Sequence, residues 1–284
     1  MEGPDFTNME ITVVGLGLIG GSLAKALRKL NFKKIWGVDI NPEVLQQATG
    51  QGVIDAGFTC GDVPLANSDL VFLALYPSQT INFVKEYQQK FKQNALITDT
   101  AGLKQKVMAG VRQYLRPDLD FVGGHPLAGK ECSGFKHASA DLFVNANYIL
   151  TPVQENKEES LALAERIIRS IGCNKPILMS PEEHDRIIAL TSHLPHLIAA
   201  ALINSNTSRN LGSLVGGSFR DATRVAAMNV SLWSELLAEN KDNILHQLDI
   251  FSANLTKIKL VIENNDPESL RNLLTQAKKT RENF

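Results

Sequence analysis

The first half of the chain alternates short apolar runs with longer amphipathic stretches. The apolar runs are β-branched and nearly continuous, which predicts strands buried on both faces of a parallel sheet. Helices are predicted between them, for example over residues 22–30, after Asn41-Pro42-Glu43 and over residues 158–171. The pattern therefore indicates a doubly wound α/β domain. The predicted strands cover residues 11–14, 34–38, 70–75, 95–98, 121–122, 148–151 and 176–179.

After Met179 no further strand pattern occurs and the chain becomes helical. Ser180-Pro181-Glu182-Glu183 matches a capping box with proline at the first helical position, which predicts a helix start. The chain is predicted to be helical from residue 231 onward, with a last helix after Asp266-Pro267-Glu268. These patterns predict an α/β domain over residues 9–179 and an all-α domain over residues 180–284.

One predicted helix of the second domain carries a narrow apolar seam. Its residues are separated alternately by four and three positions, as in coiled coils. Such a seam is explained equally well by packing within the chain and by a helical dimer interface, because the spacing does not say whose helix fills it. The seam consists of Ile244, Leu248, Phe251, Leu255, Ile258 and Ile262.

A glycine-rich turn follows the first predicted strand and opens a helix. Gly15, Gly17 and Gly20 form a GxGxxG pattern, in which the glycines allow a tight turn, close approach of a pyrophosphate and close helix packing. The backbone N–H groups at the helix start, including those of Leu18 and Ile19, would hold the anion. Asp39 ends the next strand nineteen residues after Gly20, where a carboxylate accepts hydrogen bonds from a ribose and repels a 2′-phosphate. The pattern predicts a Rossmann-type domain that binds NAD rather than NADP.

Composition and charge exclude several classes of protein. The 284 residues include 29 basic and 30 acidic ones, so bulk attraction to nucleic acid or to an anionic membrane is not expected. Uninterrupted apolar runs fall short of a bilayer span, and Met1–Glu10 lacks the apolar core of a secretory signal. Cys60, Cys132 and Cys173 are widely spaced without a CxxC pair. We therefore expect a soluble, cytoplasmic protein.

Three segments carry candidate chemistry beyond the cofactor. The first, Gly123-Gly124-His125-Pro126, follows a strand at the sheet edge where ligands bind in α/β folds. The glycines let the backbone approach a ligand, and Pro126 favours an extended His125. A histidine with a near-neutral pKa suits general acid–base catalysis on a hydroxyl group. The alternative is a histidine with a purely structural hydrogen bond.

The second segment is Thr191-Ser192-His193-Leu194-Pro195-His196, inside the helix that starts at Pro181. Pro195 cannot donate to the carbonyl of Thr191, so a kink with polar side chains is expected there. These side chains either bind substrate or satisfy the broken helix; a metal site is disfavoured because no HExxH spacing or cysteine partner occurs. Upstream, His184-Asp185 is a candidate supporting pair, although such a pair is common by chance.

The third segment begins at Gly216-Gly217 and includes Arg220, Asp221 and Arg224. The two arginines are four residues apart and are expected to share a helix face, with Asp221 beside them. Such a face is usually solvated. After a glycine-rich turn, however, an arginine is also well placed to bind a carboxylate through two parallel hydrogen bonds.

Taken together, the chain resembles the prephenate/arogenate dehydrogenase (TyrA-type) family over nearly its whole length. Each motif alone is modest, but their order and spacing are specific. The motifs are GLGLIGGSLAKAL at 15–27, GGHPLAGKECSG at 123–134, SPEEHD at 180–185, TSHLPH at 191–196 and FRDATRVAAMNVSLW at 219–233.

The resemblance implies NAD-dependent oxidative decarboxylation of prephenate to 4-hydroxyphenylpyruvate, a reaction of tyrosine biosynthesis. It also implies that the helical domain is a dimerisation domain and that the protein is a homodimer. By the same resemblance His125 accepts the hydroxyl proton and Arg224 binds a substrate carboxylate. The other substrate-binding positions that it implies are His193, Glu131, Asp221 and Trp233.

The sequence departs from the family pattern in one place and leaves alternatives open. Many members carry a serine that contacts the substrate hydroxyl and the catalytic histidine, and Gly102 stands at that position. Arogenate dehydrogenase and dual-specificity cyclohexadienyl dehydrogenase are alternative activities, because their substrates differ only in a keto or amino group. More remote alternatives are a β-hydroxyacid-type dehydrogenase, whose lysine motif is missing, and an NAD-sensing dimer without catalysis.

Overall fold

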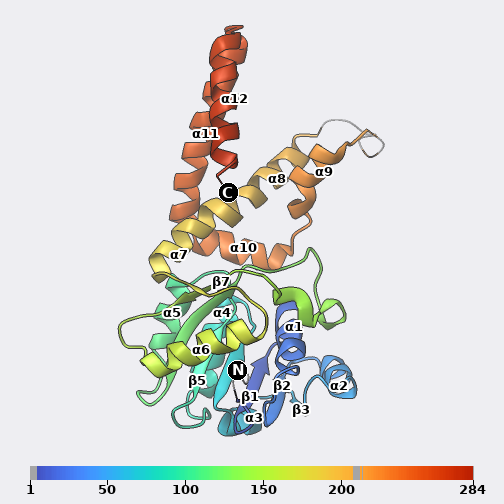
Figure 1. Cartoon of the computed structure of the whole chain (residues 1–284), viewed down its shortest axis with the longest axis vertical. Helices are drawn as coiled ribbons and strands as arrows, with labels where there is room; N and C mark the ends of the chain where they lie inside the picture. Colours follow the sequence, from blue (N-terminus) through green and yellow to red (C-terminus); the bar gives the residue numbers. More distant parts are fainter. Residues whose placement is uncertain (1–4, 207–211, 213, 284) are drawn as a thin grey trace.

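The structure is a computed structural model that describes residues 5–206, 212 and 214–283. A sheet domain forms the base of the molecule and a helical domain lies above it (Figure 1). The strands are β1 (Glu10–Val14), β2 (Lys34–Val38), β3 (Ala56–Phe58), β4 (Leu70–Leu73), β5 (Leu96–Asp99), β6 (Asp120–Pro126), β7 (Tyr148–Thr151) and β8 (Ile177–Leu178).

Helices of several kinds connect and follow these strands. The α-helices of the sheet domain are α1 (Leu18–Leu27), α2 (Pro42–Gly50), α3 (Asp62–Asn67), α4 (Pro77–Tyr87), α5 (Gln105–Arg112) and α6 (Glu158–Ser170). Those of the helical domain are α7 (Pro181–Ile188), α8 (Leu194–Asn204), α9 (Gly217–Thr223), α10 (Val230–Glu239), α11 (Lys241–Glu263) and α12 (Pro267–Arg281). Short 3₁₀ turns are η1 (Phe135–His137), η2 (Ala140–Phe143) and η5 (Arg224–Ala226), and η3 (Ala189–His193) is a π-helical turn.

The sheet has eight strands in the order β3-β2-β1-β4-β5-β6-β7-β8. Strands β1 to β6 are parallel, β7 runs antiparallel to β6, and β8 is parallel to β7. The chain crosses from β3 over β1 to β4, so the strand order reverses beside β1. Doubly wound sheets bind ligands at the carboxyl ends of the strands at such a switch point.

Helices cover both faces of the sheet, as the continuous apolar strands predict. Successive residues of a strand point to opposite faces, so Val13 packs with residues of α1 and α6, whereas Val14 packs with residues of α3, α4 and α5. Each completely buried aliphatic side chain of this kind contributes about 1.5–3 kcal/mol. The two cores hold the carboxyl ends of β1, β4, β5 and β6 at one rigid edge, which faces the helical domain.

The expected α/β architecture is confirmed, with differences at particular elements. The first helix begins at Leu18 and ends at Leu27, not over 22–30, because the glycine turn leads directly into it. Strand β3 and the helix break at Asn240 were not predicted; β3 has only three residues and no apolar alternation. In β8 both residues, Ile177 and Leu178, are exposed, so their apolar character does not reflect burial.

The helix that begins at Pro181 departs from regular α-helical geometry close to Pro195, as the sequence predicts. The α7 segment ends at Ile188, the π turn η3 follows, and α8 begins at Leu194. Among the described residues, Pro181–Asn204 is the one segment long and apolar enough, by length and composition, to span a bilayer. Its buried polar side chains, His184, Asp185 and His193, form hydrogen bonds with the sheet domain and with residue 240, as expected of a helix at a domain interface.

Candidate active site

The glycine turn between β1 and α1 has the backbone that its sequence predicts. Gly15 has φ +82°, and a Cβ there would lie 2.5 Å from the carbonyl oxygen of Ala74. A Cβ at Gly20 would lie 1.8 Å from the carbonyl oxygen of Gly15. At Gly17, in contrast, an added Cβ meets no atom of the described chain within 4 Å. Gly15 and Gly20 are therefore required by the fold, whereas Gly17 faces an open space.

The start of α1 offers donors to a ligand in that space. Gly17 is the residue that precedes the helix, and no side chain in the described chain caps it, so the N–H groups of Leu18 and Ile19 point out of the helix without a cap. Asp39 lies against the turn, because its carboxylate accepts hydrogen bonds from the N–H of Leu16 at 2.7 Å and of Asn41 at 2.9 Å. A pyrophosphate on the α1 N-terminus and a ribose at Asp39 fit this arrangement.

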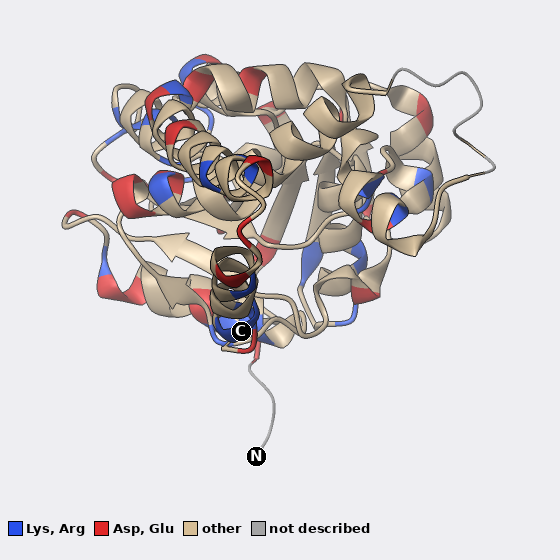
Figure 2. Ribbon diagram, turned by 90° about the horizontal axis from the view of Figure 1, so that it is seen from above, with Lys and Arg blue, Asp and Glu red and all other residues tan. Residues whose placement is uncertain are grey.

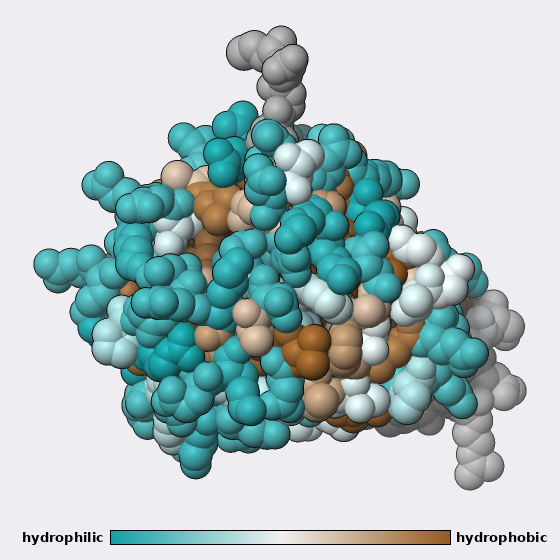
Figure 3. Space-filling view, turned by 90° about the horizontal axis from the view of Figure 1, so that it is seen from below, coloured by the Kyte–Doolittle hydropathy of each residue, from teal (hydrophilic) through white to brown (hydrophobic). Residues whose placement is uncertain are grey.

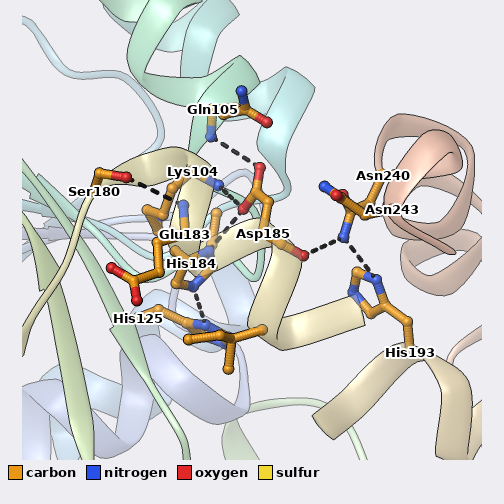
Figure 4. A network of polar contacts seen from close by, with 12 residues as sticks. Lys104, Gln105, His125, Ser180, Glu183, His184, Asp185, His193, Asn240 and Asn243 are labelled. Carbon is orange, nitrogen blue, oxygen red and sulfur yellow. Dashed lines mark hydrogen bonds and ion pairs between the residues drawn. The ribbon is translucent and has the colours of Figure 1, made fainter. Parts of the chain in front are cut away.

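His125 lies at the carboxyl end of β6, close to the domain interface. Its Nδ1 atom is 2.9 Å from Nε2 of His184, and the two rings meet edge to face (Figure 4). Burial lowers the pKa of His125 well below its usual 6.5, and the nearby charges of His184, Lys104 and His193 act in the same direction. The imidazole is therefore neutral at pH 7 and can accept a proton.

The backbone around His125 is fixed by a buried carboxylate. Asp99 at the end of β5 accepts hydrogen bonds from the N–H groups of Gly124 and Ala101, both at 3.0 Å, and forms an ion pair with the buried Lys104. A Cβ at Gly124 would lie 2.7 Å from the carbonyl oxygen of Asp99. Gly124, the glycine directly before His125, therefore lets β6 lie close to β5.

Gly102 stands beside the other nitrogen of the His125 ring. A Cβ at Gly102 would lie 3.8 Å from Nε2 of His125 and 3.4 Å from Cδ2 of Leu236, which are ordinary contact distances. The structure therefore has room for a small side chain at the position where many family members carry serine.

His193 lies in the π turn η3 and is 1% exposed. Burial lowers its pKa to about 4, so its ring is neutral at pH 7. Its Nδ1 is 3.2 Å from Nδ2 of Asn240, whose amide oxygen accepts from Asn243 at 2.8 Å. Because the Asn240 nitrogen is the donor, Nδ1 of His193 accepts and its Nε2 carries the hydrogen.

Trp233 packs against both histidines of the TSHLPH motif. Its ring meets His193 edge to face, with centroids 5.8 Å apart, and stacks on His196 at 3.6 Å. The structure therefore brings the predicted residues His193 and Trp233 together in one aromatic cluster of the helical domain.

Arg224 and Glu131 form an ion pair between the two domains. Glu131 lies in the loop after β6, six residues beyond His125, and Arg224 begins η5. Arg220 lies on α9, which ends at Thr223, and Arg224 directly follows at the start of the 3₁₀ turn η5. Asp221 is on α9 and exposed.

Sequence reasoning overlooked several polar residues of this region. Asp99 had a signal, since it directly follows a predicted strand at the ligand-binding edge. Asp185 had only a weak one beside His184. Asn240 and Lys104 had none. The groups to which the Asn240 amide nitrogen donates are 47 and 55 residues away in the sequence, and the burial of Lys104 depends on tertiary packing.

Two family models match the chain. The model described as "Prephenate dehydrogenase, nucleotide-binding domain" matches residues 23–175, and "Prephenate dehydrogenase, dimerization domain" matches residues 180–276. The prephenate dehydrogenase of Bacillus subtilis (strain 168) is 37% identical over 279 residues, which cover 96% of this chain and 75% of that protein. The chain belongs to the prephenate dehydrogenase family.

Solved structures of this family have the same fold. The crystal structure of the A. aeolicus prephenate dehydrogenase with hydroxyphenyl propionate and NAD⁺ has a TM-score of 0.90 and 32% identity, and 99% of each chain is covered. The Synechocystis arogenate dehydrogenase has a TM-score of 0.83 and 29% identity, with 97% of this chain and 99% of that chain covered.

Membership in the prephenate dehydrogenase family confirms the expected fold class and enzyme class. The protein is an oxidoreductase with a nucleotide-binding domain and a helical dimerisation domain. This finding disfavours a β-hydroxyacid-type dehydrogenase and a non-catalytic NAD sensor. The family match starts at residue 23, so the assignment of the glycine turn rests on the geometry described above.

Proposed function

We propose that this protein catalyses the NAD-dependent oxidative decarboxylation of prephenate to 4-hydroxyphenylpyruvate, a step of tyrosine biosynthesis. The observation that carries the proposal is the neutral His125 ring at the sheet edge, with one nitrogen bonded to His184 and the other beside the open position at Gly102. The glycine turn and Asp39 belong to the same domain and fit NAD. Family membership supports the reaction.

The chemistry assigned to His125 is a proton transfer in each direction. When bound, NAD accepts hydride from the ring carbon that bears the hydroxyl group. His125 Nε2 takes the hydroxyl proton as the carbon–oxygen double bond forms. When the ring carboxylate leaves as carbon dioxide, its bonding electrons aromatise the ring, and Nε2 returns the proton to the phenolic oxygen. Aromatisation and loss of carbon dioxide supply the driving force, so the protein mainly orients substrate and holds the proton.

Substrate binding is assigned to groups of both domains. Arg224 would bind a substrate carboxylate in place of the carboxylate of Glu131, its partner in the structure. His193 presents a donor at Nε2, because its Nδ1 accepts from Asn240. Trp233 would line the pocket beside His193, and Asp221 would belong to the polar gate with Glu131. The two-domain division at residues 9–179 and 180–284 is part of this proposal.

We also propose that the protein is a cytoplasmic homodimer whose interface is on the helical domain. Of the apolar seam on α11, Ile244 is 6% exposed and packs within the chain, whereas Leu255, Ile258 and Ile262 are 54%, 37% and 57% exposed. The α11–α12 pair projects away from the body of the molecule (Figure 1). A second copy that covers the exposed part of the seam would remove this apolar surface from water. The dimerisation-domain match over residues 180–276 supports a dimer formed by the helical domain.

Steady-state kinetics with purified protein test the proposal. Protein, NAD and prephenate should produce NADH absorbance, and arogenate or NADP in place of prephenate or NAD should give a lower kcat/KM. A higher kcat/KM with arogenate would favour arogenate dehydrogenase, and similar values would favour cyclohexadienyl dehydrogenase. No NADH with either substrate would contradict the proposal.

A further inference from the structure

A buried chain of hydrogen bonds connects His125 to the helical domain. His184 lies on α7 and is completely buried, with Nε2 2.9 Å from Nδ1 of His125 and Nδ1 2.7 Å from Oδ1 of Asp185 (Figure 4). The chain therefore runs from a carboxylate through one imidazole to the proposed catalytic imidazole.

The carboxylate of Asp185, the last group in this series of hydrogen bonds, is held by the sheet domain. Its Oδ1 accepts the N–H of Lys104 at 2.8 Å and its Oδ2 accepts the N–H of Gln105 at 3.0 Å. Both N–H groups lie at the start of α5, where the helix leaves backbone donors without partners in the helix. Asn240 also donates to the backbone carbonyl of Asp185 at 2.8 Å. The carboxylate thus has one orientation, held from both domains.

The positions of the hydrogens follow from these partners. A carboxylate that accepts from two backbone N–H groups needs a donor from His184, so Nδ1 of His184 carries the hydrogen. Nε2 of a neutral His184 is then an acceptor, and Nδ1 of His125 must donate to it. That leaves Nε2 of His125 with a lone pair, on the side where Gly102 leaves space.

Burial favours the neutral form of both rings. Burial lowers the pKa of His184, although its hydrogen bond to Asp185 acts in the opposite direction, and Lys104 adds to the lowering. Lys104 likewise lowers the pKa of His125. With both rings neutral, only one placement of the ring hydrogens gives Asp185 a donor and also forms the hydrogen bond between His184 and His125.

We propose that His184, held by Asp185, is a positioning residue that fixes the catalytic tautomer of His125. The pair selects the form of His125 with hydrogen on Nδ1 and a basic Nε2. It also fixes the plane of the ring, and it stabilises the imidazolium formed when His125 takes the substrate proton. A general base must present its lone pair to the proton that it removes. Without the His184–Asp185 pair, part of the protein would therefore hold the His125 tautomer with hydrogen on Nε2, which cannot accept a proton there.

This role rests on the proposed function, and one readout is independent of activity. Long-range ¹H–¹⁵N spectra of the histidine-labelled holoenzyme report which ring nitrogen carries the hydrogen, with His125→Asn used for assignment. The wild-type spectrum should show His125 as the Nδ1–H form. An Nε2–H form in the wild type would overturn the proposal whatever the substrate proves to be, whereas absent turnover with a correct tautomer would contradict only the proposed function.

Two substitutions at position 184 test the cause of the tautomer. His184→Leu removes the acceptor, so the His125 signal should change to a mixture of both forms and kcat should fall about 10²-fold, within the range of general-base catalysis. KM for prephenate and Kd for NAD should change less than about threefold, since His184 is predicted to contact neither ligand. His184→Gln offers an amide nitrogen to Asp185 and an oxygen to His125, so it should restore most of kcat and the Nδ1–H form.

Matched controls separate positioning from folding. His137→Leu removes an exposed histidine of the sheet domain and should leave kcat and the His125 spectrum unchanged. An unchanged His125 tautomer in folded His184→Leu would overturn the proposal, as would an equal loss of kcat in the Leu and Gln variants. If His184→Leu does not fold, the wild-type tautomer and the His184→Gln kinetics still decide the matter.

Discussion

The pKa of His125 depends on burial and on groups that are far from it in the sequence. Lys104 and His193 disfavour an added charge on the ring, and burial acts most strongly in the same direction. A neutral ring at pH 7 is ready to accept a proton, and its acidic conjugate would return that proton easily. The pKa of the proposed general base is therefore set by burial and by residues of both domains.

Replacement of His125 by Asn should remove the base while retaining a side chain of similar polarity. We expect kcat to fall by about 10²–10⁴-fold, the usual contribution of a general base. NAD binding, measured by fluorescence titration, should stay near the wild-type value, because the glycine turn lies on a different strand. Unchanged turnover would remove His125 from the mechanism.

Replacement of Arg224 by Ala should act on binding rather than on chemistry. Loss of a charge-assisted pair costs about 1.5–3 kcal/mol, so KM for prephenate should rise about 10- to 150-fold with a smaller change in kcat. Arg220→Ala on the neighbouring helix α9 is the matched control. Equal effects of the two substitutions would indicate a general loss of positive charge instead of a specific contact.

At the scale of elements, sequence patterns locate what is local and miss what is tertiary. Pro181 and Asp266-Pro267 mark helix starts because capping and proline act within one turn. Pro195 predicts a deviation in its helix, but not that it takes the form of a π turn over Ala189–His193, which depends on packing.

Candidate-site residues divide in the same way. The sequence marks His125, His193 and the glycine turn, because each interrupts a regular pattern with polar or small residues. It gives little weight to Asp185 and none to Asn240, since an aspartate within a helix and an asparagine at a helix end are both common on any surface. Their importance comes from partners that only the folded chain brings near.

The glycine turn predicts opposite outcomes for two similar substitutions. Gly20→Ala places a Cβ against the Gly15 carbonyl, so β1 and α1 must move apart and the free energy of unfolding should fall by more than about 2 kcal/mol. Gly17→Ala meets no protein atom of the described chain and should cost less than about 1 kcal/mol, but the methyl group occupies the predicted phosphate position and should raise Kd for NAD at least about tenfold.

Denaturant unfolding and NAD titration of both variants check this prediction. Normal NAD affinity in Gly17→Ala would place the pyrophosphate elsewhere. A stable Gly20→Ala protein would contradict the packing seen at the turn.

At the scale of the whole molecule, the two domains present different surfaces. The face of the sheet domain turned away from the helices is largely hydrophilic, with scattered apolar spots (Figure 3). Seen from the helical side, charges of both signs are interspersed (Figure 2). The α11–α12 pair differs, because Leu255, Leu260, Ile262 and Leu274 are each at least half exposed. Unpartnered apolar side chains on a projecting pair favour association.

The proposed homodimer predicts that one charged substitution on α11 separates the subunits. Leu255→Lys should shift the mass measured by sedimentation equilibrium toward the monomer. Val63→Lys, at a similarly exposed position of the sheet domain, should leave the mass unchanged. A dimer that survives Leu255→Lys and Ile262→Lys together would place the interface outside this seam.

Stability should depend on pH through the buried histidines. The pKa of His193 is about 4 in the folded chain and about 6.5 when unfolded, so below pH 6.5 the unfolded chain takes up a proton that the folded chain does not. The free energy of unfolding should therefore fall as the pH falls from 7 to 5, by about 2 kcal/mol from His193 alone. The loss from this residue ends below about pH 4, where the folded chain is also protonated.

Urea unfolding at a fixed protein concentration measures this slope. His193→Gln, which does not titrate, should show a smaller decrease between pH 7 and pH 5. An equal decrease in the variant would assign the effect to other groups.

His184 and Asp185, the pair that orients His125, belong to the helical domain, whereas His125 itself belongs to the sheet domain. Separate expression of the two halves should therefore yield a nucleotide-binding fragment whose imidazole has no fixed tautomer. In a chimera with a relative, a helical domain from the other protein would support catalysis only if it supplied its own imidazole and carboxylate. The carboxylate would also have to reach the backbone N–H groups at the start of α5. Recombination of this enzyme is thus constrained by two residues that are predicted to contact neither ligand.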